Sequence, residues 1–497
     1  MNDKKPNIIL FIVDNMCAWT LGTYGNPDAY TPNLDRMAAQ GIQFNNCYGA
    51  SALCSPGRAS LLTGVMPSAH GVHLALPDSE GMYPEDWCAL DGFESLSGTL
   101  KDNSYNTAMI GKWHLGDYPT KHPQTGFDYW VCKEDGHTSD FWGDAYWEDG
   151  KRHVYEGHMT ELWTNKALDY LQDHANDQEP FFMYVSYNAP YSTSGCLDAE
   201  INGKDKNPFW PRFENKEMES MPREPVAQEA ISYAMMINQV APQYGFQEEI
   251  RGINNMPRLR NVFSQISYVD DGIGQIMTEL QKLGLDDDTI VMFTADHGTS
   301  YGQNGNWGTG WTTIPFTGHR HGWSIPLIMR YPGRIAAGQE SDLMVMQTDI
   351  YSTLLDLAET DYTPNGHSPG SSLAPLLRSE KLEGDFDAVF CEIHELRLMR
   401  TREWLYIKHF DKQNENELYD LLRDPGEHRN VISDPSNADV LAEMDAALAE
   451  FFKEHAAPEY DVWNGGTMVA SIVPPIDEAP YKAAYGEDWK PIFPMEA

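Results

Sequence analysis

Two pairs of polar residues in this sequence each follow an apolar run that predicts a buried strand. Asp14 and Asn15 follow "NIILFIV". Asp296 and His297 follow "TIVMFTA". Two carboxylates with amide and imidazole groups suit a hard divalent cation such as Ca²⁺ or Mg²⁺. Taken singly, an Asp after a strand is more often a turn or helix-capping residue, so the metal hypothesis depends on the two pairs meeting in the fold.

A third polar pair, Lys112 and His114 in "GKWHLG", follows the apolar run "YNTAMI". A lone Lys or His is usually a surface residue, because charged side chains are costly to bury. Placed at the end of a central strand, however, the two would lie where ligands bind in α/β proteins. They are therefore candidates for holding an anion beside the metal.

The stretch "CSPGRASLLTG" puts Cys54 at the start of a predicted helix, with Pro56 and Arg58 close behind it. The start of a helix favours anions, because its first backbone N–H groups are free to donate and the positive end of the helix dipole lies there. The seven cysteines are scattered and include no CxxC pair, so neither a disulfide framework nor a zinc site is predicted. The position of Cys54 therefore needs a reason other than cross-linking.

Strands and helices alternate over about three-quarters of the chain, which predicts an α/β fold with a doubly wound, mostly parallel central sheet flanked by helices. In such sheets ligands collect beyond the carboxyl ends of the strands, where the three polar pairs fall. The predicted strands cover residues 7–13, 42–50, 105–111, 180–187, 289–298 and 325–333. The predicted helices cover residues 32–40, 95–103, 160–174 and 257–283.

The pattern changes near residue 387, where short antiparallel strands and then one helix over residues 437–455 are predicted. We therefore predict a catalytic α/β domain at residues 1–380 and a smaller C-terminal α+β subdomain at 381–457. The remaining residues, 458–497, form a tail rich in Pro and aromatic residues. This tail either lies on its own domain or reaches a neighbouring subunit of a homo-oligomer, and the sequence favours neither.

The chain is strongly acidic, with 74 Asp and Glu against 35 Lys and Arg and a formal net charge of −39. Such a field repels nucleic acid and anionic membranes, so neither is a predicted partner. The apolar run near the N-terminus is too short for a membrane span or a typical signal core. We expect a cytoplasmic protein as the sequence stands, or a periplasmic or secreted one if a signal peptide has been removed.

Together these motifs resemble those of the formylglycine-dependent type I sulfatases of the alkaline phosphatase superfamily. In the family's order the chain carries "PNIILFIVDN", the C-x-P-x-R modification signature as "CSPGR", then "GKWHLG", "TIVMFTADHG" and "ELYDLLRDPGEHRN". The resemblance implies that a maturation enzyme oxidises Cys54 to formylglycine. The hydrated aldehyde would attack sulfur, and sulfate would then be expelled as the aldehyde re-forms.

The resemblance also implies a role for each matching residue. The implied metal ligands are Asp14, Asn15, Asp296, His297 and the modified Cys54. Arg58 would hold the formylglycine oxygens, and Lys112 would bind a sulfate oxygen. His114 would contact the formylglycine hydroxyl and act as the base when the sulfated intermediate collapses. Oxygen-rich ligation favours Ca²⁺, with Mg²⁺ as the alternative.

The sequence departs from the family pattern at Asn15 and at Tyr191. Asn15 stands where a second Asp is usual; its amide oxygen can still bind the metal, with one negative charge fewer. Tyr191 follows "PFFMYVSYNAP", where the family commonly has a His near the leaving-group oxygen. A tyrosine has a reference pKa of about 10 and is a poorer acid near neutrality.

A third departure is the family's second lysine, because the corresponding place holds Pro315. The nearby stretch "GHRHGWSIP" offers His319, Arg320 and His321 instead. We favour His321, then His319, as the missing cation or general acid. The alternative is that these residues bind the sugar or a carboxylate of the substrate, or cap a loop. His319, Arg320 and Tyr191 are therefore candidates for substrate binding.

We predict a sulfuric ester hydrolase whose substrate is a sulfated carbohydrate or another small organic sulfate. An aromatic-rich loop at residues 130–147 and the irregular segment 191–260 are the expected pocket walls, since Trp and Tyr faces pack well on sugar rings. One alternative is a phosphonate monoester or phosphodiester hydrolase of the same superfamily. Another is a catalytically idle binding protein, which the intact modification signature disfavours.

Overall fold

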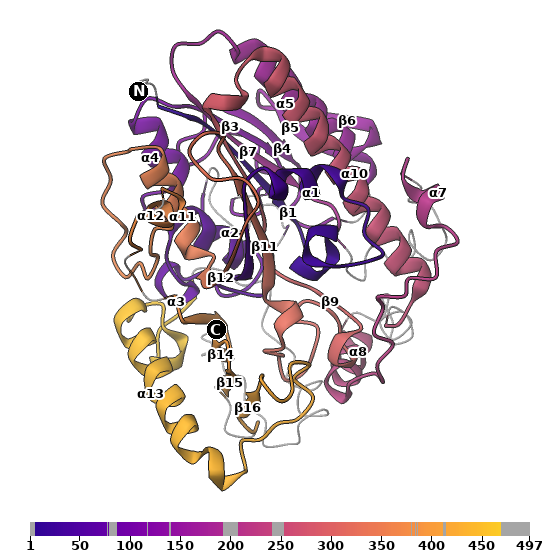
Figure 1. Ribbon diagram of the computed structural model, residues 1–497, viewed down its shortest axis with the longest axis vertical. Coiled ribbons are helices and arrows are strands. Elements are labelled where there is room, and N and C mark those ends of the chain that lie inside the picture. Colours follow the sequence, from indigo (N-terminus) through magenta and orange to yellow (C-terminus); the bar gives the residue numbers. More distant parts are fainter. Residues whose placement is uncertain are drawn as a thin grey trace.

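A ten-stranded sheet forms the centre of the protein in the computed structural model (Figure 1). The structure describes residues 5–76, 78, 87–116, 118–138, 141–191, 207–240, 253–378, 380–382, 384, 386–410 and 414–468. The strand order is β12-β2-β11-β8-β1-β7-β3-β4-β5-β6. These strands are β1 (Asn7–Val13), β2 (Ile42–Tyr48), β3 (Asn106–Gly111), β4 (Tyr129–Lys133), β5 (Trp142–Glu148), β6 (Lys151–His158), β7 (Phe181–Tyr187), β8 (Thr289–Ala295), β11 (Ser324–Arg330) and β12 (Gln339–Met346).

The middle of the sheet is parallel, and its strands are the apolar runs of the sequence. Strand β1 pairs in parallel with β7 and with β8, and all three are buried along their whole length. Strands buried on both faces need continuous apolar sequence rather than alternation, which is why the runs were recognisable. Two regions are antiparallel: β11 pairs that way with β2 and β8, and β5 with β4 and β6.

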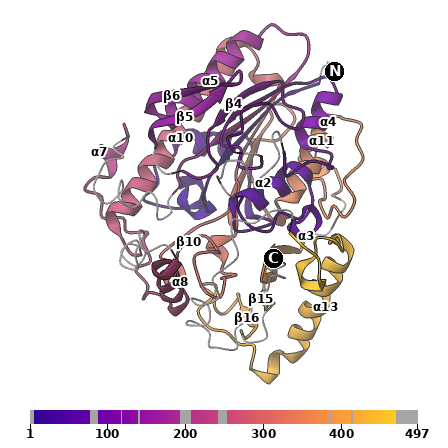
Figure 2. The ribbon, with the colours of Figure 1, turned by 180° about the vertical axis from the view of Figure 1, so that it is seen from behind.

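Helices cover both faces of the sheet (Figures 1 and 2). One group consists of α1 (Pro32–Ala39), α5 (Met159–His174) and α10 (Met256–Leu283), in which α10 contacts both others. The other consists of α2 (Cys54–Thr63), α4 (Leu96–Asp102) and α11 (Thr348–Leu357), which also contact one another. The predicted doubly wound α/β architecture is confirmed.

Shorter elements connect these layers, and several of them surround the carboxyl ends of the central strands. Gly302 starts a turn between the two strands of a small antiparallel ribbon. The ribbon strands are β9 (Ser300–Tyr301) and β10 (Trp307–Gly308). The short helices are α3 (Pro67–His70), α7 (Trp210–Phe213), α8 (Gln228–Val240) and α12 (Ala374–Leu377).

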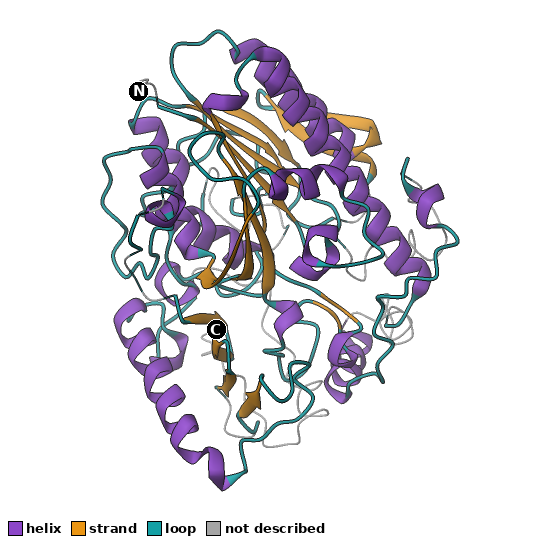
Figure 3. Ribbon diagram, viewed as in Figure 1, coloured by secondary structure: helices purple, strands orange, loops and turns teal. Residues whose placement is uncertain are grey.

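A second, four-stranded antiparallel sheet follows in the C-terminal part (Figure 3). Its strands are β13 (Ala388–Ile393), β14 (Leu396–Thr401), β15 (Trp404–His409) and β16 (Glu417–Asp420). Helix α13 (Ala438–His455) packs on it through the buried side chains of Met444, Leu448 and Phe452. The predicted antiparallel strands and single helix are therefore present. The predicted tail is described as far as residue 468, and residues 469–497 lie outside the described residues.

One local prediction was wrong. Residues 130–147 do not form one loop, because they contain most of β4 and β5. Strand β5 is held by hydrogen bonding to β4 and to β6, and such pairing is invisible in local composition. Within the described part of the chain, we find no helix that combines the length and apolarity needed to cross a membrane.

Candidate active site

The carboxyl ends of β1 and β8 bring the first two polar pairs together. The strands are parallel neighbours, and their last residues, Val13 and Ala295, lie in register. The residues that follow therefore meet at one edge of the sheet, and they are Asp14, Asn15, Asp296 and His297. One ligand atom from each aspartate, from His297 and from Cys54 lie within 4.8 Å of one another. All four of these side chains are buried.

Cys54 is the first residue of α2 and faces this cluster. Its Sγ lies 3.5 Å from Oδ1 of Asp14 and 3.3 Å from Nε2 of His297. The helix can come so close because residue 57 is glycine: a Cβ on Gly57 would lie 2.3 Å from the main-chain oxygen of Asp296. The glycine in "CSPGR" thus permits residue 54 to lie close to the carboxylates.

The unmodified thiol is poorly suited to chemistry at this position. Burial and, next, the charge of Asp14 raise the pKa of Cys54 well above its ordinary value. Nucleophilic attack and metal ligation both require the thiolate, which is disfavoured here. The surroundings therefore suit a side chain whose reactive oxygen does not need a free thiolate.

Asn15 is held in an unusual conformation with unsatisfied polar atoms. Its φ is 61°, a left-handed value that is uncommon outside glycine. Its main-chain N–H donates to Oδ1 of Asp296 at 3.2 Å. The buried amide Oδ1 and Nδ2 have no hydrogen-bond partner among the described residues, although buried polar atoms are nearly always paired. An amide oxygen left open beside two carboxylates and an imidazole fits a divalent cation, so this donor set is a candidate metal centre.

Arg58 lies one turn along α2 from Cys54 and is completely buried. Its Nε donates to Oδ2 of Asp296 at 3.0 Å, and its Nη2 forms an ion pair with the same oxygen at 2.9 Å. Its Nη1 donates to the carbonyl oxygen of Lys112 at 2.8 Å and to Oγ of Ser186 at 2.7 Å. The Arg58 guanidinium thus connects α2 with the ends of β8, β7 and β3. It places a fixed positive charge beside the carboxylate of Asp296.

Lys112 follows β3 and pairs with Oδ2 of Asp14, with both side chains fully buried. Burial opposes the charged form of Lys112, but Asp14 raises the pKa of the ammonium group above its ordinary value. Burial and Asp296 raise the pKa of Asp14. Although burial opposes it, His297 and Arg58 hold the pKa of Asp296 at about 2. The two carboxylates therefore repel each other, and a bound cation would relieve that repulsion.

His114 also has a left-handed backbone, with a φ of 61°. Its Nε2 lies 2.9 Å from the carbonyl oxygen of Leu76. A carbonyl only accepts, so Nε2 carries the hydrogen and Nδ1 carries the lone pair. Nδ1 is buried without a partner among the described residues. Burial and the neighbouring His137 lower the pKa of His114 well below its ordinary value, so the ring is a neutral hydrogen-bond acceptor.

A pocket of about 180 Å³ opens beside Cys54 and Asn15. Tyr191 lines it, and Nζ of Lys112 lies 4.9 Å from the centre of the Tyr191 ring. The pocket walls also come from β10, α8 and the start of α10, and include Tyr233, Arg258, Trp307, Trp311 and His137. The segment 191–260 thus contributes Tyr191, Tyr233 and Arg258.

The histidines of "GHRHGWSIP" lie elsewhere. Nδ1 of His319 is 3.3 Å from Oε2 of Glu427, and the main-chain N–H of Arg320 donates to the same oxygen at 2.8 Å. The His321 ring packs edge-on against Trp19 at a centroid distance of 6.2 Å. Burial and Arg320 lower the pKa of His321 to about 4. Of the described residues that line the pocket, none is from this stretch, and the roles expected for it stay predictions.

Sequence reasoning did not single out His137, Arg258 or Asp78. His137 lies within the aromatic-rich segment 130–147, where it carried no motif of its own. Arg258 begins α10 and is buried against the ring of Trp307 at 4.8 Å. Asp78 is joined to the ring and main chain of His137 by hydrogen bonds. Only the fold, which brings His137 and Arg258 to the pocket and Asp78 to His137, marks them as candidate site residues.

Known protein families and individual proteins match this chain over most of its length. A family model described as Sulfatase matches residues 6–360, and one described as N-sulphoglucosamine sulphohydrolase, C-terminal, matches residues 317–454. The chain is 27% identical to an N-acetylglucosamine-6-O-sulfatase of Bacteroides thetaiotaomicron, over 91% of this chain and 87% of that protein. It is 30% identical to the N-acetylgalactosamine-6-sulfatase of Mus musculus, over 71% of this chain and 63% of that protein.

Solved structures are similar across almost the whole chain. One, a protein in complex with its substrate D-glucosamine-2-N,6-O-disulfate, has a TM-score of 0.70 at 25% identity and covers 91% of this chain and 98% of its own. The phosphonate monoester hydrolase of Agrobacterium radiobacter has a TM-score of 0.67 at 19% identity, covering 91% of this chain and 97% of its own. The latter similarity shows the shared fold alone.

Proposed function

Since this chain belongs to the sulfatase family, we propose that it releases sulfate from sulfated carbohydrates with a formylglycine made from Cys54. The protein is a sulfuric ester hydrolase; the nucleophile, the metal and the class of alcohol are the proposal. One observation carries it: the acidic ends of β1 and β8 converge on residue 54 at the start of α2. A thiol at residue 54 is poorly suited to attack, because its thiolate is disfavoured there. The hydrated aldehyde of formylglycine would supply a hydroxyl group as the nucleophile instead.

The metal centre would consist of the four side chains at the ends of β1 and β8. They are Asp14, Asn15, Asp296 and His297. When bound, a divalent cation withdraws charge from an adjacent oxygen and makes a hydroxyl group there easier to deprotonate. We propose Ca²⁺, because three of the four ligands are oxygens and Ca²⁺ tolerates irregular coordination better than Mg²⁺ does.

The positive side chains would hold the sulfate group and compensate charge during its transfer. Lys112 is fully buried beside Asp14, from which its ammonium group could reach a sulfate oxygen in the pocket. Arg58 is fixed by Asp296 and Ser186, so it would hold the oxygens of residue 54 without reorganising. Preorganised charges of this kind are among the largest contributions to transition-state stabilisation.

His114 would act as the base when sulfate leaves residue 54. Its Nε2–H is donated to Leu76, so its unpaired Nδ1 is the atom able to accept a proton. Because its pKa is lowered, the ring stays neutral and ready to accept near neutral pH. The carbonyl of Leu76 would fix this tautomer, as a hydrogen-bonding partner does for most catalytic histidines.

The proposed alcohol is a sulfated sugar. The named relatives act on sulfated amino sugars, and Trp307, Trp311 and Tyr233 give the pocket aromatic walls. Arg258 adds a positive charge that a second anionic group on the sugar could use. The proposed partners are this substrate and a maturation enzyme that reads "CSPGR"; a homo-oligomer formed through the tail remains a proposal without support from the described residues.

Two measurements test this function. Mass spectrometry of the peptide containing residue 54, after expression in a host with the maturation enzyme, should find the aldehyde. Assays with matched 4-nitrophenyl sulfate, phosphate and phosphonate esters should give the highest kcat/KM for the sulfate, and 6-sulfated N-acetylhexosamines should release sulfate. A persistent thiol, or a preference for the phosphonate, would contradict the proposal.

A further inference from the structure

His137 and Asp78 form a hydrogen-bonded pair at the pocket. Nδ1 of His137 lies 2.5 Å from Oδ2 of Asp78. The same carboxylate accepts the main-chain N–H of His137 at 3.0 Å and that of Gly136 at 2.7 Å. These bonds fix both the loop and the ring, and they require that Nδ1 carry its hydrogen.

The other ring nitrogen of His137 is available to a ligand. His137 lines the pocket that also contains Cys54, and its side chain is 36% exposed. With Nδ1 turned to Asp78, Nε2 is on the opposite side of the ring, and it has no partner among the described residues. The ring packs edge-on against His114 at a centroid distance of 4.6 Å. His137 therefore lies beside the base of the reaction with one N–H free to donate.

The reaction needs an acid that the other candidates supply poorly. The oxygen of a sugar alcohol is a poor leaving group, so it must be protonated as the S–O bond breaks. Tyr191 is a weak acid near neutral pH. His319 is held by Glu427 and His321 packs against Trp19, and neither lines the pocket.

We propose that His137 is the general acid that protonates the leaving alcohol, and that Asp78 is the residue that positions it. This inference rests on the proposed sulfate ester hydrolysis. The arrangement matches the general pattern in which a carboxylate orients an imidazole and stabilises its charged form. It gives the site two histidines with different tasks: His114, buried and neutral, accepts a proton, and His137, paired with a carboxylate, donates one.

The proton and electron balance of the step is complete without another reactant. The S–O bond to the alcohol breaks, and its electron pair stays on the alcohol oxygen as the sulfuryl group passes to the nucleophile at residue 54. That oxygen takes the proton from Nε2 of His137, and the neutral alcohol leaves. His137 is then neutral, still donates Nδ1–H to Asp78, and regains its proton from water before the next cycle.

The charged groups around His137 are compatible with this role. Asp78 is the acidic neighbour, and its pKa is held well below the usual range by the hydrogen bond from His137 although burial opposes this. His114 is neutral, and Nζ of Lys133 donates to the main-chain oxygen of His137 at 2.9 Å. Asp78, His114 and His137 could also be read as metal ligands, but the three N–H groups already bound by Asp78 favour a positioning role over metal binding.

The test uses aryl sulfates of nearly equal shape whose leaving groups differ, from 4-nitrophenyl to 4-methylphenyl sulfate. In the enzyme carrying formylglycine, H137Q should lower kcat/KM for 4-methylphenyl sulfate by about 10²–10³-fold, a typical contribution of an acid. For 4-nitrophenyl sulfate, which needs little protonation, the loss should be at least tenfold smaller. D78N should show the same dependence on the leaving group with a smaller loss.

The pH profile gives a second readout. For 4-methylphenyl sulfate, the alkaline limb of the kcat profile of the parent enzyme should be absent in H137Q, because the variant has no acid at this position. Y191F and H321Q serve as matched variants of the rival acids, and H153Q, an exposed histidine on β6, as the control. If H137Q loses kcat/KM equally for all esters, or if Y191F or H321Q shows the dependence on the leaving group instead, His137 is not the general acid. The proposed sulfate ester hydrolysis would be unaffected by that result. If the parent enzyme releases no sulfate from any ester, the proposed function fails with it.

Discussion

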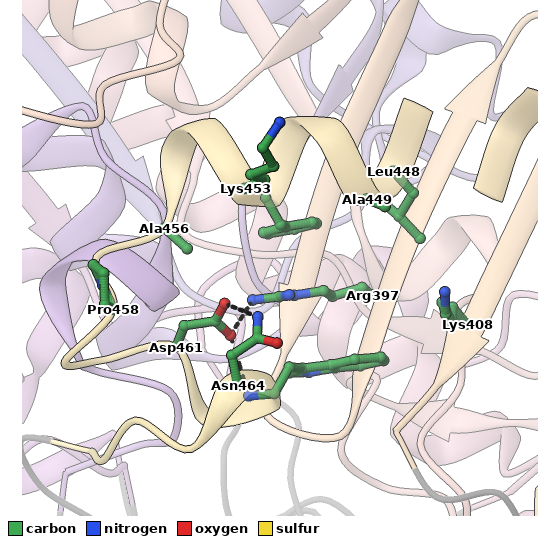
Figure 4. Close-up of a pocket in the computed structure, with 11 residues that line it drawn as sticks. Arg397, Lys408, Leu448, Ala449, Lys453, Ala456, Pro458, Asp461 and Asn464 are labelled. Atoms are coloured by element: carbon green, nitrogen blue, oxygen red, sulfur yellow. Dashed lines mark hydrogen bonds and ion pairs between the residues drawn. The ribbon is translucent and has the colours of Figure 1, made fainter. Parts of the chain in front are cut away.

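Two pockets of this protein differ in a way that separates a catalytic site from structural packing. The pocket between α13 and β14–β15 has a volume of about 490 Å³ and is lined by Arg397, Lys408, Lys453 and Asp461, among others (Figure 4). The pocket beside Cys54 has about 180 Å³. Size and visible positive charge would both favour the first as an anion site, yet the proposed active site is the second.

In the larger pocket, each cation already has an acidic partner. Arg397 donates to Oδ1 of Asp461 at 2.8 Å and to Oε2 of Glu392 at 3.1 Å, and it stacks on the ring of Phe452 at 3.9 Å. Figure 4 shows the Arg397 guanidinium pointing to Asp461. Lys408 pairs with Asp445 and Lys453 with Glu450. The charges are thus paired within the protein, and no buried side-chain N or O atom of the described residues that line this pocket lacks a hydrogen-bond partner.

In the smaller pocket the polar groups conflict with one another. Two aspartates are forced together, an asparagine amide is buried without a partner, and two non-glycine residues, Asn15 and His114, have left-handed backbones. Local conflicts of this kind are costly to folding and persist where function requires them. The convergence of these groups at one place, rather than pocket size, therefore supports the smaller pocket as the proposed active site.

The largest effect should come from residue 54 itself. C54A removes the proposed nucleophile and should lower kcat for sulfate release by about 10⁴–10⁶-fold, the range seen when a nucleophile is lost. Its thermal unfolding midpoint should change little, because alanine fills most of the same buried space. The measurement is sulfate release with 4-nitrophenyl sulfate, together with a thermal melt. Residual activity within tenfold of the parent enzyme would show that residue 54 is not the attacking group.

Removal of the metal comes next. Dialysis against a calcium chelator should lower activity by at least about 10³-fold. It should also lower the thermal midpoint, because a ligand present at a concentration of 100 times its Kd stabilises the folded protein by about 2.7 kcal/mol. The loss of stability follows because Asp14 and Asp296 then repel each other without a cation between them. Adding back Ca²⁺ or Mg²⁺ in separate titrations identifies the preferred ion. In D14N the titration should show weaker binding, and unchanged binding there would place the metal elsewhere.

Much of the fold and the convergence of most of the candidate metal ligands were predictable, because they depend on continuous signals in the chain. Strand β1 is one apolar run, and the carboxylates come directly after it and after β8. The parallel pairing that joins these two strands follows from the α/β pattern. A strand such as β5 was missed because its sequence is polar and aromatic, and it is defined by its partners.

Residues that reach the pocket from irregular segments could not be predicted. His137 and Asp78 are 59 positions apart, and neither lies in a periodic pattern or a recognised motif. The stretch containing His319 and His321 was selected because it offers cationic residues near the place of the family's second lysine, yet Glu427, from a distant turn, holds His319. Composition suggests which residues are able to do chemistry, whereas long-range contacts decide where they lie.

A smaller effect on activity is expected from the helix that carries residue 54. In G57A the added Cβ would lie 2.3 Å from the main-chain oxygen of Asp296, so α2 must shift away from β8. A displacement of about 1 Å at a catalytic group can cost about 10²-fold in rate, and we expect a loss of that order in kcat. G366A is the matched control, because a Cβ there meets nothing within 4 Å. If G57A forms formylglycine normally and retains the activity of G366A, close approach of α2 is not required.

The smallest effect on activity should come from the larger pocket, and it should appear in stability instead. R397M leaves Asp461 and Glu392 buried without their partner, and breaking a buried pair costs about 3–5 kcal/mol. K453M is the control: its pair with Glu450 is 74% and 67% exposed, and exposed pairs contribute about 0–1 kcal/mol. R397M should therefore melt well below K453M while kcat/KM of both stays within about twofold of the parent enzyme below the melting range. A large fall in the kcat/KM of well-folded R397M, with its thermal midpoint kept, would instead mean that the larger pocket takes part in substrate binding.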